Sequence, residues 1–327
     1  MKLLSFEVDG AEGARFGVLA TLASKDYVID LTRASNVSDS ASHKVPSDVE
    51  SLLRMGDAGL TAVREVVARI ALPAAGGSGL ADLMKKRIIH AQDAIRFLPP
   101  VPRPGKIIMV GTNYRSHATE GKSQAGNLPP ARAEKHEWPV SFSKFPSVMI
   151  GHGRPIVYPS HTKQLDYEAE LCVIIGRKCK DVSEADALDV VAGYTIANDV
   201  SMRDLQFAEM RRGAIMMGKN LDTSSPMGPY FVTKDEIPDP HALNISCRVN
   251  GETRQNDNTA NMIYTVPWLI SYFSRMTLEP GDILSTGTTA GVGIFHEPPE
   301  DWLLRPGDVV EVEVEKIGVL SNAVVAG

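Results

Sequence analysis

The sequence predicts an α+β protein with a smaller N-terminal domain and a larger C-terminal domain. Residues 1–31 contain short stretches in which apolar and polar residues alternate, and residues 47–94 have apolar residues at helical spacing. Beyond residue 105, runs of β-branched residues end at turn signals or at acidic side chains. These patterns predict strands followed by helices in the N-terminal part and further strands in the remainder, which is the α+β class.

Length and composition limit the function classes. A chain of 327 residues is long enough for two domains, and 34 basic against 40 acidic residues give a net charge of −6. This charge argues against a nucleic-acid surface or a polybasic membrane patch. No apolar run reaches the length of a membrane span, and the N-terminus becomes polar too early for a signal peptide. We therefore expect a soluble cytoplasmic protein.

The cysteines support a reducing compartment. The sequence has three, and their spacing fits neither disulfide pairs nor a C-x-x-C metal site. Cys172 lies in a strand-like run, where a small buried apolar residue is expected.

The N-terminal part predicts an accessory domain, residues 1–98. An antiparallel meander is expected first, with turn signals at Gly10, Gly13 and Lys25–Asp26. Two helices are then expected over 47–60 and 60–72, and a third over 80–94. The meander strands are expected at 1–8, 16–23 and 27–31.

Three local features complete this part. Ser47 is the expected N-cap of the first helix. His90 stands alone, which favours a surface or interface histidine. Four prolines within residues 97–105 predict a stiff, extended linker over 99–105, so the larger domain spans 106–327.

Three acidic residues predict a metal site. Glu168 and Glu170 lie two apart at the start of the β-branched run 172–175, so both point to one face of a strand. Asp199 follows the apolar run 190–197, where another strand is expected to end. Two carboxylates on one strand face are more often solvated, but a third beside them favours a hard divalent cation such as Mg²⁺ or Mn²⁺.

A histidine and a glutamate stand three residues apart after the strand-like run 106–110. His117 and Glu120 fall in the expected first turn of a helix, where their side chains can meet. A carboxylate that holds an imidazole fixes its tautomer and raises its basicity, as a general base requires. A surface pair is the alternative. The polar residues 121–139 that follow predict an active-site lid or a disordered loop.

Further polar residues occur at the ends of later elements. Lys144 ends a short alternating strand and is either an exposed lysine or a carboxylate-binding one. Arg203 and Gln206 follow Asp199 at helical spacing and can face the same pocket, although a surface Arg203–Asp204 pair is the alternative. Lys219 lies in a polar turn, where its ammonium can stabilise a developing enolate oxygen. The glycine-rich stretch 287–293 has no helix after it, which argues against a phosphate-binding loop.

Taken together, these motifs resemble the fumarylacetoacetate hydrolase superfamily. The resemblance covers Lys106 to the C-terminus and rests on six stretches in matching order: GTNYRSHATE, SFSKFPS, DYEAELCVIIG, NDVSMRDLQF, GKNLDTSSPMGP and STGTTAGVG. It implies a mixed β-roll or β-sandwich catalytic domain, a homodimer, and Mg²⁺ or Mn²⁺ on Glu168, Glu170 and Asp199, with Ca²⁺ also compatible. The N-terminal hundred residues resemble the variable domain of some members.

The resemblance also assigns roles to side chains. His117 and Glu120 match the water-activating dyad of the acylpyruvase-like members, and Lys219 is expected to assist catalysis. Substrate contacts are expected from Arg115, Lys144, Arg203, Gln206 and Thr288.

The main functional expectation is hydrolysis of a C–C bond in an acylpyruvate or 2,4-diketo acid. The stretch Met109–Gly111 lacks the carboxylate that true fumarylacetoacetases carry ahead of their histidine, which argues against that branch. The same chemistry also serves oxaloacetate decarboxylation, 2-oxo-enoate hydration, and keto–enol or double-bond isomerisation. A metal-binding protein without catalysis is a remote alternative.

Overall fold

A computed structural model describes residues 1–36, 44–74, 77–120 and 135–327. The protein has the α+β fold that the sequence predicts, with a mixed main sheet, a second sheet and few helices. Within the described ranges, no helix is long and apolar enough to cross a membrane. Most of the predicted lid, residues 121–134, lies outside them.

The main sheet has twelve strands in the described part of the chain. Ten of them form one path, in which the β17–β6 pair is parallel and the others are antiparallel. Two short strands attach to it, β5 (Arg96–Phe97) at β1 and β8 (Met149–Ile150) at β14. In path order the strands are β4 (Ile89–Ala91), β3 (Lys25–Asp30), β2 (Arg15–Leu22), β1 (Lys2–Glu7), β14 (Ser225–Thr233), β12 (Val191–Asn198), β11 (Ala169–Ile175), β17 (Ile283–Thr288), β6 (Ile107–Gly111) and β7 (Val140–Ser143).

The second sheet packs on one face of the main sheet, and a two-stranded sheet lies near the site. Apolar residues of β15 and β18, in the second sheet, form one core with apolar residues of β11 and β12, in the main sheet. Its strands in order are β16 (Glu252–Asn258), β15 (Asn244–Val249), β18 (Val309–Val314), β19 (Gly318–Ala326) and β9 (Ile156–Tyr158). The small sheet consists of β10 (Leu165–Asp166) and β13 (Ser201–Met202).

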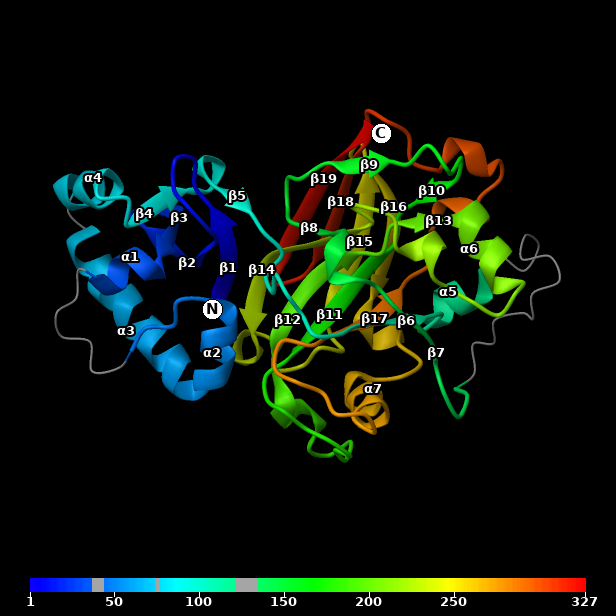
Figure 1. The fold of residues 1–327 in the computed structure, drawn as a ribbon, viewed down its shortest axis with the longest axis horizontal. Coiled ribbons are helices and arrows are strands. Elements are labelled where there is room, and N and C mark those ends of the chain that lie inside the picture. The colour runs from blue at the N-terminus through cyan, green and yellow to red at the C-terminus, as the bar shows by residue number, and fades with distance from the viewer. Residues whose placement is uncertain (37–43, 75–76, 121–134) are drawn as a thin grey trace.

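The helices divide between the two parts of the chain. Figure 1 shows α1 to α4 beside β1 to β4 on one side of the molecule, and the other helices around the larger part. The helices are α1 (Leu31–Asn36), α2 (Val49–Met55), α3 (Asp57–Ala74), α4 (Gly77–Lys85), α5 (Arg115–Thr119), α6 (Arg203–Met210) and α7 (Val266–Phe273).

The N-terminal strands continue the main sheet. The predicted meander β1–β2–β3 forms, and β1 then pairs with β14, with Lys2 opposite Val232 and Leu3 opposite Phe231. Leu3 also shares a core with Phe231 and with apolar residues of α2 and α3. Sequence patterns find each strand but not this pairing, because β1 and β14 are far apart in the chain.

Several local predictions in this region are wrong in detail. The third helix ends at Lys85 instead of Ala94, since Arg87 has a positive φ of 54° and β4 follows. His90 is therefore a buried strand residue, 7% exposed. The N-cap of α2 is Asp48, whose side chain accepts a hydrogen bond from Ser51 N, instead of Ser47. The β2–β3 turn falls at Ala23–Ser24, both with positive φ.

Strand β11 is buried on both faces and organises the larger part. Leu171 and Val173 face the core shared with the second sheet, whereas Cys172 and Ile174 face the core shared with the N-terminal helices. This explains why β11 is a continuous apolar run. Glu170 has the same parity as Cys172, so it projects from the second face.

A β-bulge in β17 sets the register beside Glu170. Glu170 is opposite Thr288 and Cys172 is opposite Ser285, so β17 has one extra residue there. Gly287 adopts a φ of 86°, and a Cβ on it would lie 2.7 Å from Val110 O. A glycine is required at this position because both the backbone angle and the space exclude a side chain.

Substituting Gly287→Ala is expected to lower the free energy of unfolding by about 2–4 kcal/mol, because the cost of a strained φ and the cost of a steric clash add together. Gly153→Ala is the matched control, since Gly153 has a φ of 75° but open space around its Cβ position. Its cost is expected to stay at about 1–2 kcal/mol. Urea unfolding of both variants measures the difference, and equal losses would contradict the close-packing account.

Candidate metal centre

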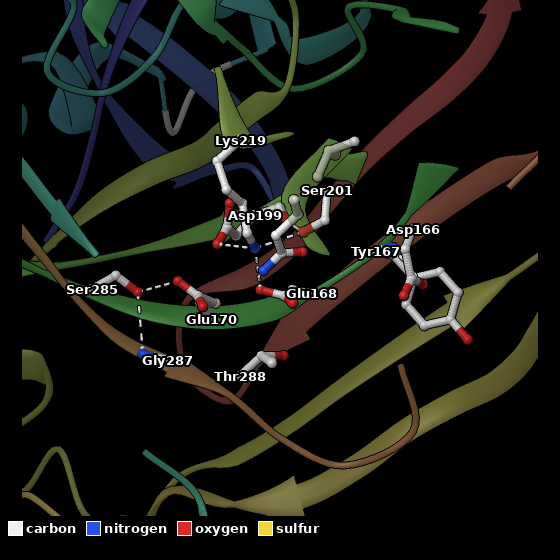
Figure 2. A network of polar contacts seen from close by, with 12 residues as sticks. Asp166, Tyr167, Glu168, Glu170, Asp199, Ser201, Lys219, Ser285, Gly287 and Thr288 are labelled. Carbon is white, nitrogen blue, oxygen red and sulfur yellow. Dashed lines mark hydrogen bonds and ion pairs between the residues drawn. The ribbon is translucent and has the colours of Figure 1, made fainter. Parts of the chain in front are cut away.

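Three carboxylates converge where β11 begins and β12 ends. β11 and β12 are antiparallel, with Ala169 opposite Asn198, so Glu168 and Glu170 lie beside Asp199. One ligand atom from each of the three acidic residues lies within 4.8 Å of the others, and all three residues are buried. The predicted convergence of these residues is therefore present in the structure (Figure 2).

Lys219 bridges two of the carboxylates. It lies in the 3₁₀ turn η4 (Met217–Lys219), and its Nζ donates to Glu168 Oε2 at 2.9 Å, Asp199 Oδ2 at 2.7 Å and Ser201 Oγ at 2.6 Å. In Figure 2 its side chain reaches between Asp199 and Glu168. The ammonium is thus placed to balance negative charge at the carboxylates or on a ligand held beside them.

Lys144 contacts the carboxylate oxygen of Asp199 that Lys219 does not contact. Its Nζ lies 3.0 Å from Asp199 Oδ1 and donates to the main-chain carbonyls of Val200, Lys219 and Ser224. The side chain has no exposed surface. Its contacts connect the end of β7 with η4 and hold Asp199 in place.

The charges of this cluster shift one another's protonation. Burial opposes ionisation of Glu168, but the charges of Lys219 and Arg203 outweigh it and lower its pKa to about 2. Burial and the charges of Asp199 and Glu168 hold the pKa of Glu170 well above its ordinary value. Burial lowers the pKa of Lys144 in spite of Asp199. For Lys219 the neighbouring carboxylates overcome burial and raise the pKa.

Arg203 and Gln206 extend the network on helix α6. Arg203 Nη1 lies 2.7 Å from Glu168 Oε1 and donates to Gln206 Oε1 at 3.0 Å, while its Nε donates to Asp166 Oδ2 at 2.8 Å. Arg203 joins the network through Glu168 and Gln206 through Arg203, but not by the helical spacing from Asp199 that the sequence predicts, because β13 lies between Asp199 and the helix. A surface Arg203–Asp204 pair is excluded, because Arg203 is 3% exposed.

The histidine–glutamate pair forms at the end of α5. His117 Nδ1 lies 2.9 Å from Glu120 Oε2, and Glu120 Oε1 accepts a hydrogen bond from Gly291 N at 2.7 Å. Phe295 of the 3₁₀ turn η7 (Gly293–Phe295) lies 5.9 Å from His117 between ring centroids. Arg115, on the same short helix, is exposed. The imidazole is therefore held through Nδ1 near the carboxylates.

Strands β16 and β17 supply further polar groups, of which the sequence analysis names Thr288 but not Gln255 or Ser285. Gln255 Oε1 accepts from Ala169 N, and its Nε2 donates to Thr288 Oγ1 at 2.9 Å. Thr288 Oγ1 donates in turn to Ala169 O at 3.0 Å. Ser285 Oγ donates to Glu170 Oε2. No spacing signal links these residues to β11. Ser285 and Thr288 reach it through the pairing of β17 with β11, and Gln255 through packing of the second sheet on the main sheet, in each case over more than 80 residues.

The donor set fits a hard divalent cation. All three candidate ligands are oxygen donors, and the buried Asp199 Oδ1 has the Lys144 ammonium 3.0 Å away. Four buried carboxylates (Asp166, Glu168, Glu170 and Asp199) lie among three buried cations (Lys144, Arg203 and Lys219), and burial and the neighbouring carboxylates raise the pKa of Glu170, a cost that a bound cation would relieve. Carboxylate oxygens are the ligands that Mg²⁺, Mn²⁺ and Ca²⁺ prefer.

Comparison with known proteins identifies relatives over the whole chain. The family described as Fumarylacetoacetate (FAA) hydrolase C-terminal matches residues 106–325. The mitochondrial oxaloacetate tautomerase of Xenopus laevis is 37% identical over 326 residues, covering 99% of this chain and 90% of the relative. Oxaloacetate tautomerase YisK of Bacillus subtilis is 43% identical over 241 residues, covering 72% of this chain and 75% of the relative.

A solved structure supports the same relationship. Fumarylacetoacetate hydrolase from psychrophilic Exiguobacterium antarcticum is 34% identical, with a TM-score of 0.72 and full coverage of both chains. The likeness therefore includes the N-terminal strands and helices.

Adding Mg²⁺ or Mn²⁺ is expected to raise the thermal unfolding temperature. A ligand present at 100 times its Kd stabilises the folded state by about 2.7 kcal/mol. Glu170→Gln should abolish the shift while keeping the size of the side chain, because it removes a charged ligand. Glu313→Gln, on β18 in the second sheet, is the control and should keep it. Equal shifts in both variants, measured by scanning calorimetry, would contradict the assignment of Glu170.

Proposed function

The chain belongs to the fumarylacetoacetate hydrolase family, and we propose that it is a divalent-cation-dependent isomerase that interconverts the keto and enol forms of oxaloacetate. The observation that carries the proposal is the buried triad of Glu168, Glu170 and Asp199 beside the paired His117 and Glu120. The names of two relatives that match the chain, both oxaloacetate tautomerases, support this substrate and reaction.

The reaction needs a base and a group that stabilises negative charge on the 2-oxo oxygen, which takes its proton from water. Going from keto to enol form, a proton leaves C3 of oxaloacetate and one is added to the 2-oxo oxygen. His117 Nε2 is proposed to accept the C3 proton, because Nδ1 is engaged by Glu120. Lys219 Nζ is proposed to stabilise negative charge on the 2-oxo oxygen, since it lies at the centre of the carboxylate cluster.

Glu168, Glu170 and Asp199 would hold the divalent cation, which supplies Lewis acidity toward a 2-oxo oxygen when bound. Lys144 is proposed to act through Asp199, because its contacts and its burial separate it from a substrate. The sequence analysis expects Lys144 to contact the substrate directly, and the proposal replaces that role with a contact to Asp199.

The two carboxylates of oxaloacetate require cationic or hydrogen-bonding partners. Arg203 Nη2 is buried without a hydrogen bond to the described residues and is a candidate donor. Gln206 and Thr288 are proposed to orient the substrate beside it, and exposed Arg115 to meet it at the entrance. A charged fork such as Arg203 is well suited to a carboxylate.

Hydrolysis of an acylpyruvate, the main expectation from the sequence, is the second candidate. The solved relative that covers the whole chain is named a fumarylacetoacetate hydrolase, and His117 held by Glu120 could equally activate water. Isomerisation is favoured because relatives that match up to 99% of this chain are named for it.

The location and assembly are also proposals. We propose a cytoplasmic homodimer, consistent with three free cysteines, two of them buried. The relative from Xenopus laevis is mitochondrial by name, so fractionation of the native host cell distinguishes the two locations.

The test is to add enol oxaloacetate from anhydrous solvent and to follow loss of its ultraviolet absorption. Wild-type protein with Mn²⁺ should accelerate the loss of the enol. A coupled assay with malate dehydrogenase should identify the product as keto oxaloacetate. His117→Gln should lower kcat by about 100-fold or more, because the base is lost. His161→Gln, at an exposed histidine outside the cluster, should leave it unchanged.

Other products point to the alternatives. Pyruvate detected with lactate dehydrogenase would indicate decarboxylation, and cleavage of acetylpyruvate at a higher kcat/KM would favour the hydrolase. If wild-type protein binds Mn²⁺ tightly but the enol disappears only at its spontaneous rate, the isomerase proposal is contradicted. A binding protein without this activity would then be favoured.

A further inference from the structure

Asp166 lies beside the metal centre and has no exposed surface. It ends β10, next to Tyr167 and two residues before Glu168. Its Oδ1 accepts hydrogen bonds from Tyr167 N at 2.9 Å and Gly293 N at 2.8 Å. Its Oδ2 accepts from Ile294 N at 3.1 Å and from Arg203 Nε at 2.8 Å. The carboxylate therefore connects three separate segments of the chain.

One connection fixes the plane of Arg203. Asp166 holds the Nε side of the guanidinium, and Glu168 Oε1 lies 2.7 Å from Nη1. With two sides engaged, the planar group has no freedom to rotate. Only Nη2 then lacks a hydrogen bond among the described residues. The direction in which Arg203 presents this donor is set by Asp166.

The other connection fixes the segment after β17. Gly293 and Ile294 begin the 3₁₀ turn η7 (Gly293–Phe295), and a Cβ on Gly293 would lie 2.8 Å from Asp166 Oδ1. Phe295, in the same turn, lies 5.9 Å from His117 between ring centroids. Asp166 therefore holds the turn that packs beside the proposed base.

We propose that Asp166 is a positioning residue whose carboxylate aligns Arg203 and the η7 turn with the triad and whose charge allows a divalent cation to bind there. The inference rests on the cation site of the proposed function and adds a residue that controls it. The charge argument is direct: without Asp166, the buried cation of Arg203 faces the triad with no partner of its own. An unbalanced positive charge in contact with Glu168 opposes binding of a second cation.

The experiment measures Mn²⁺ binding by isothermal titration calorimetry without substrate. Asp166→Asn keeps the shape of the side chain and removes its charge, and it is expected to weaken Mn²⁺ binding by about 10-fold or more, as for other groups that support metal ligands. Asp204→Asn is the matched control on α6. Asp204 accepts hydrogen bonds from Thr162 Oγ1 and Lys163 N and has no contact with the triad, so its variant should bind Mn²⁺ as wild type does.

A second background separates positioning from general loss of structure. If Asp166 acts through Arg203, Asp166→Asn should change Mn²⁺ affinity by less than about 3-fold when Arg203→Gln is already present, because contacting residues couple. The full 10-fold loss in that background would overturn the role through Arg203. Circular dichroism verifies that each variant is folded.

If Asp166→Asn does not fold, Gly293→Ala tests the positioning role alone, because it keeps the charge but crowds Asp166 Oδ1 and the main-chain oxygen of Trp302. Unchanged Mn²⁺ affinity in folded Asp166→Asn would overturn the inference, and unchanged affinity in folded Gly293→Ala would overturn its positioning part. Either result leaves the proposed function standing. A wild-type protein that binds no Mn²⁺ would overturn the cation site itself, and with it both proposals.

Discussion

Burial of several carboxylates at the ends of two adjacent strands is the constraint on which the rest of the site depends. A carboxylate removed from water is costly unless a cation or hydrogen-bond donors accompany it. Here Lys219 bridges Glu168 and Asp199, and Arg203 holds the other oxygen of Glu168. The carboxylate oxygens that remain suit a divalent cation. The same charges that make the site costly to bury therefore define its ligand.

The fold supplies the rigid frame that this arrangement requires. β11 has apolar residues on both faces, and the second sheet packs on one of them while the N-terminal helices cover the other. Glu168 and Glu170 lie at the start of this strand, which is covered on both faces, so their backbone is held rigidly in place. The N-terminal part thus belongs to the architecture of the site through β1 and β14, although the structure places none of the candidate catalytic residues in it.

Much of the site could be predicted from sequence because its signals are local. Glu168 and Glu170 share a face through strand alternation, and His117 meets Glu120 through helical spacing. The roles of Asp166 and Gln255 could not be predicted, since their partners come from other elements, Arg203 37 residues and Gly293 127 residues from Asp166, and Ala169 86 residues from Gln255. The mainly β larger part was predictable for the same local reason, whereas the pairing of β1 with β14 depends on tertiary packing. The reaction was not predictable, because related reactions differ in where a proton or water is delivered.

The most direct test of the central claim is diffraction from crystals grown with Mn²⁺, with data collected at the manganese absorption edge. The account predicts an anomalous peak bounded by carboxylate oxygens of Glu168, Glu170 and Asp199, at ordinary metal–oxygen distances. A peak elsewhere, with Lys219 alone balancing the triad at saturating Mn²⁺, would contradict the assignment of these residues as a metal centre.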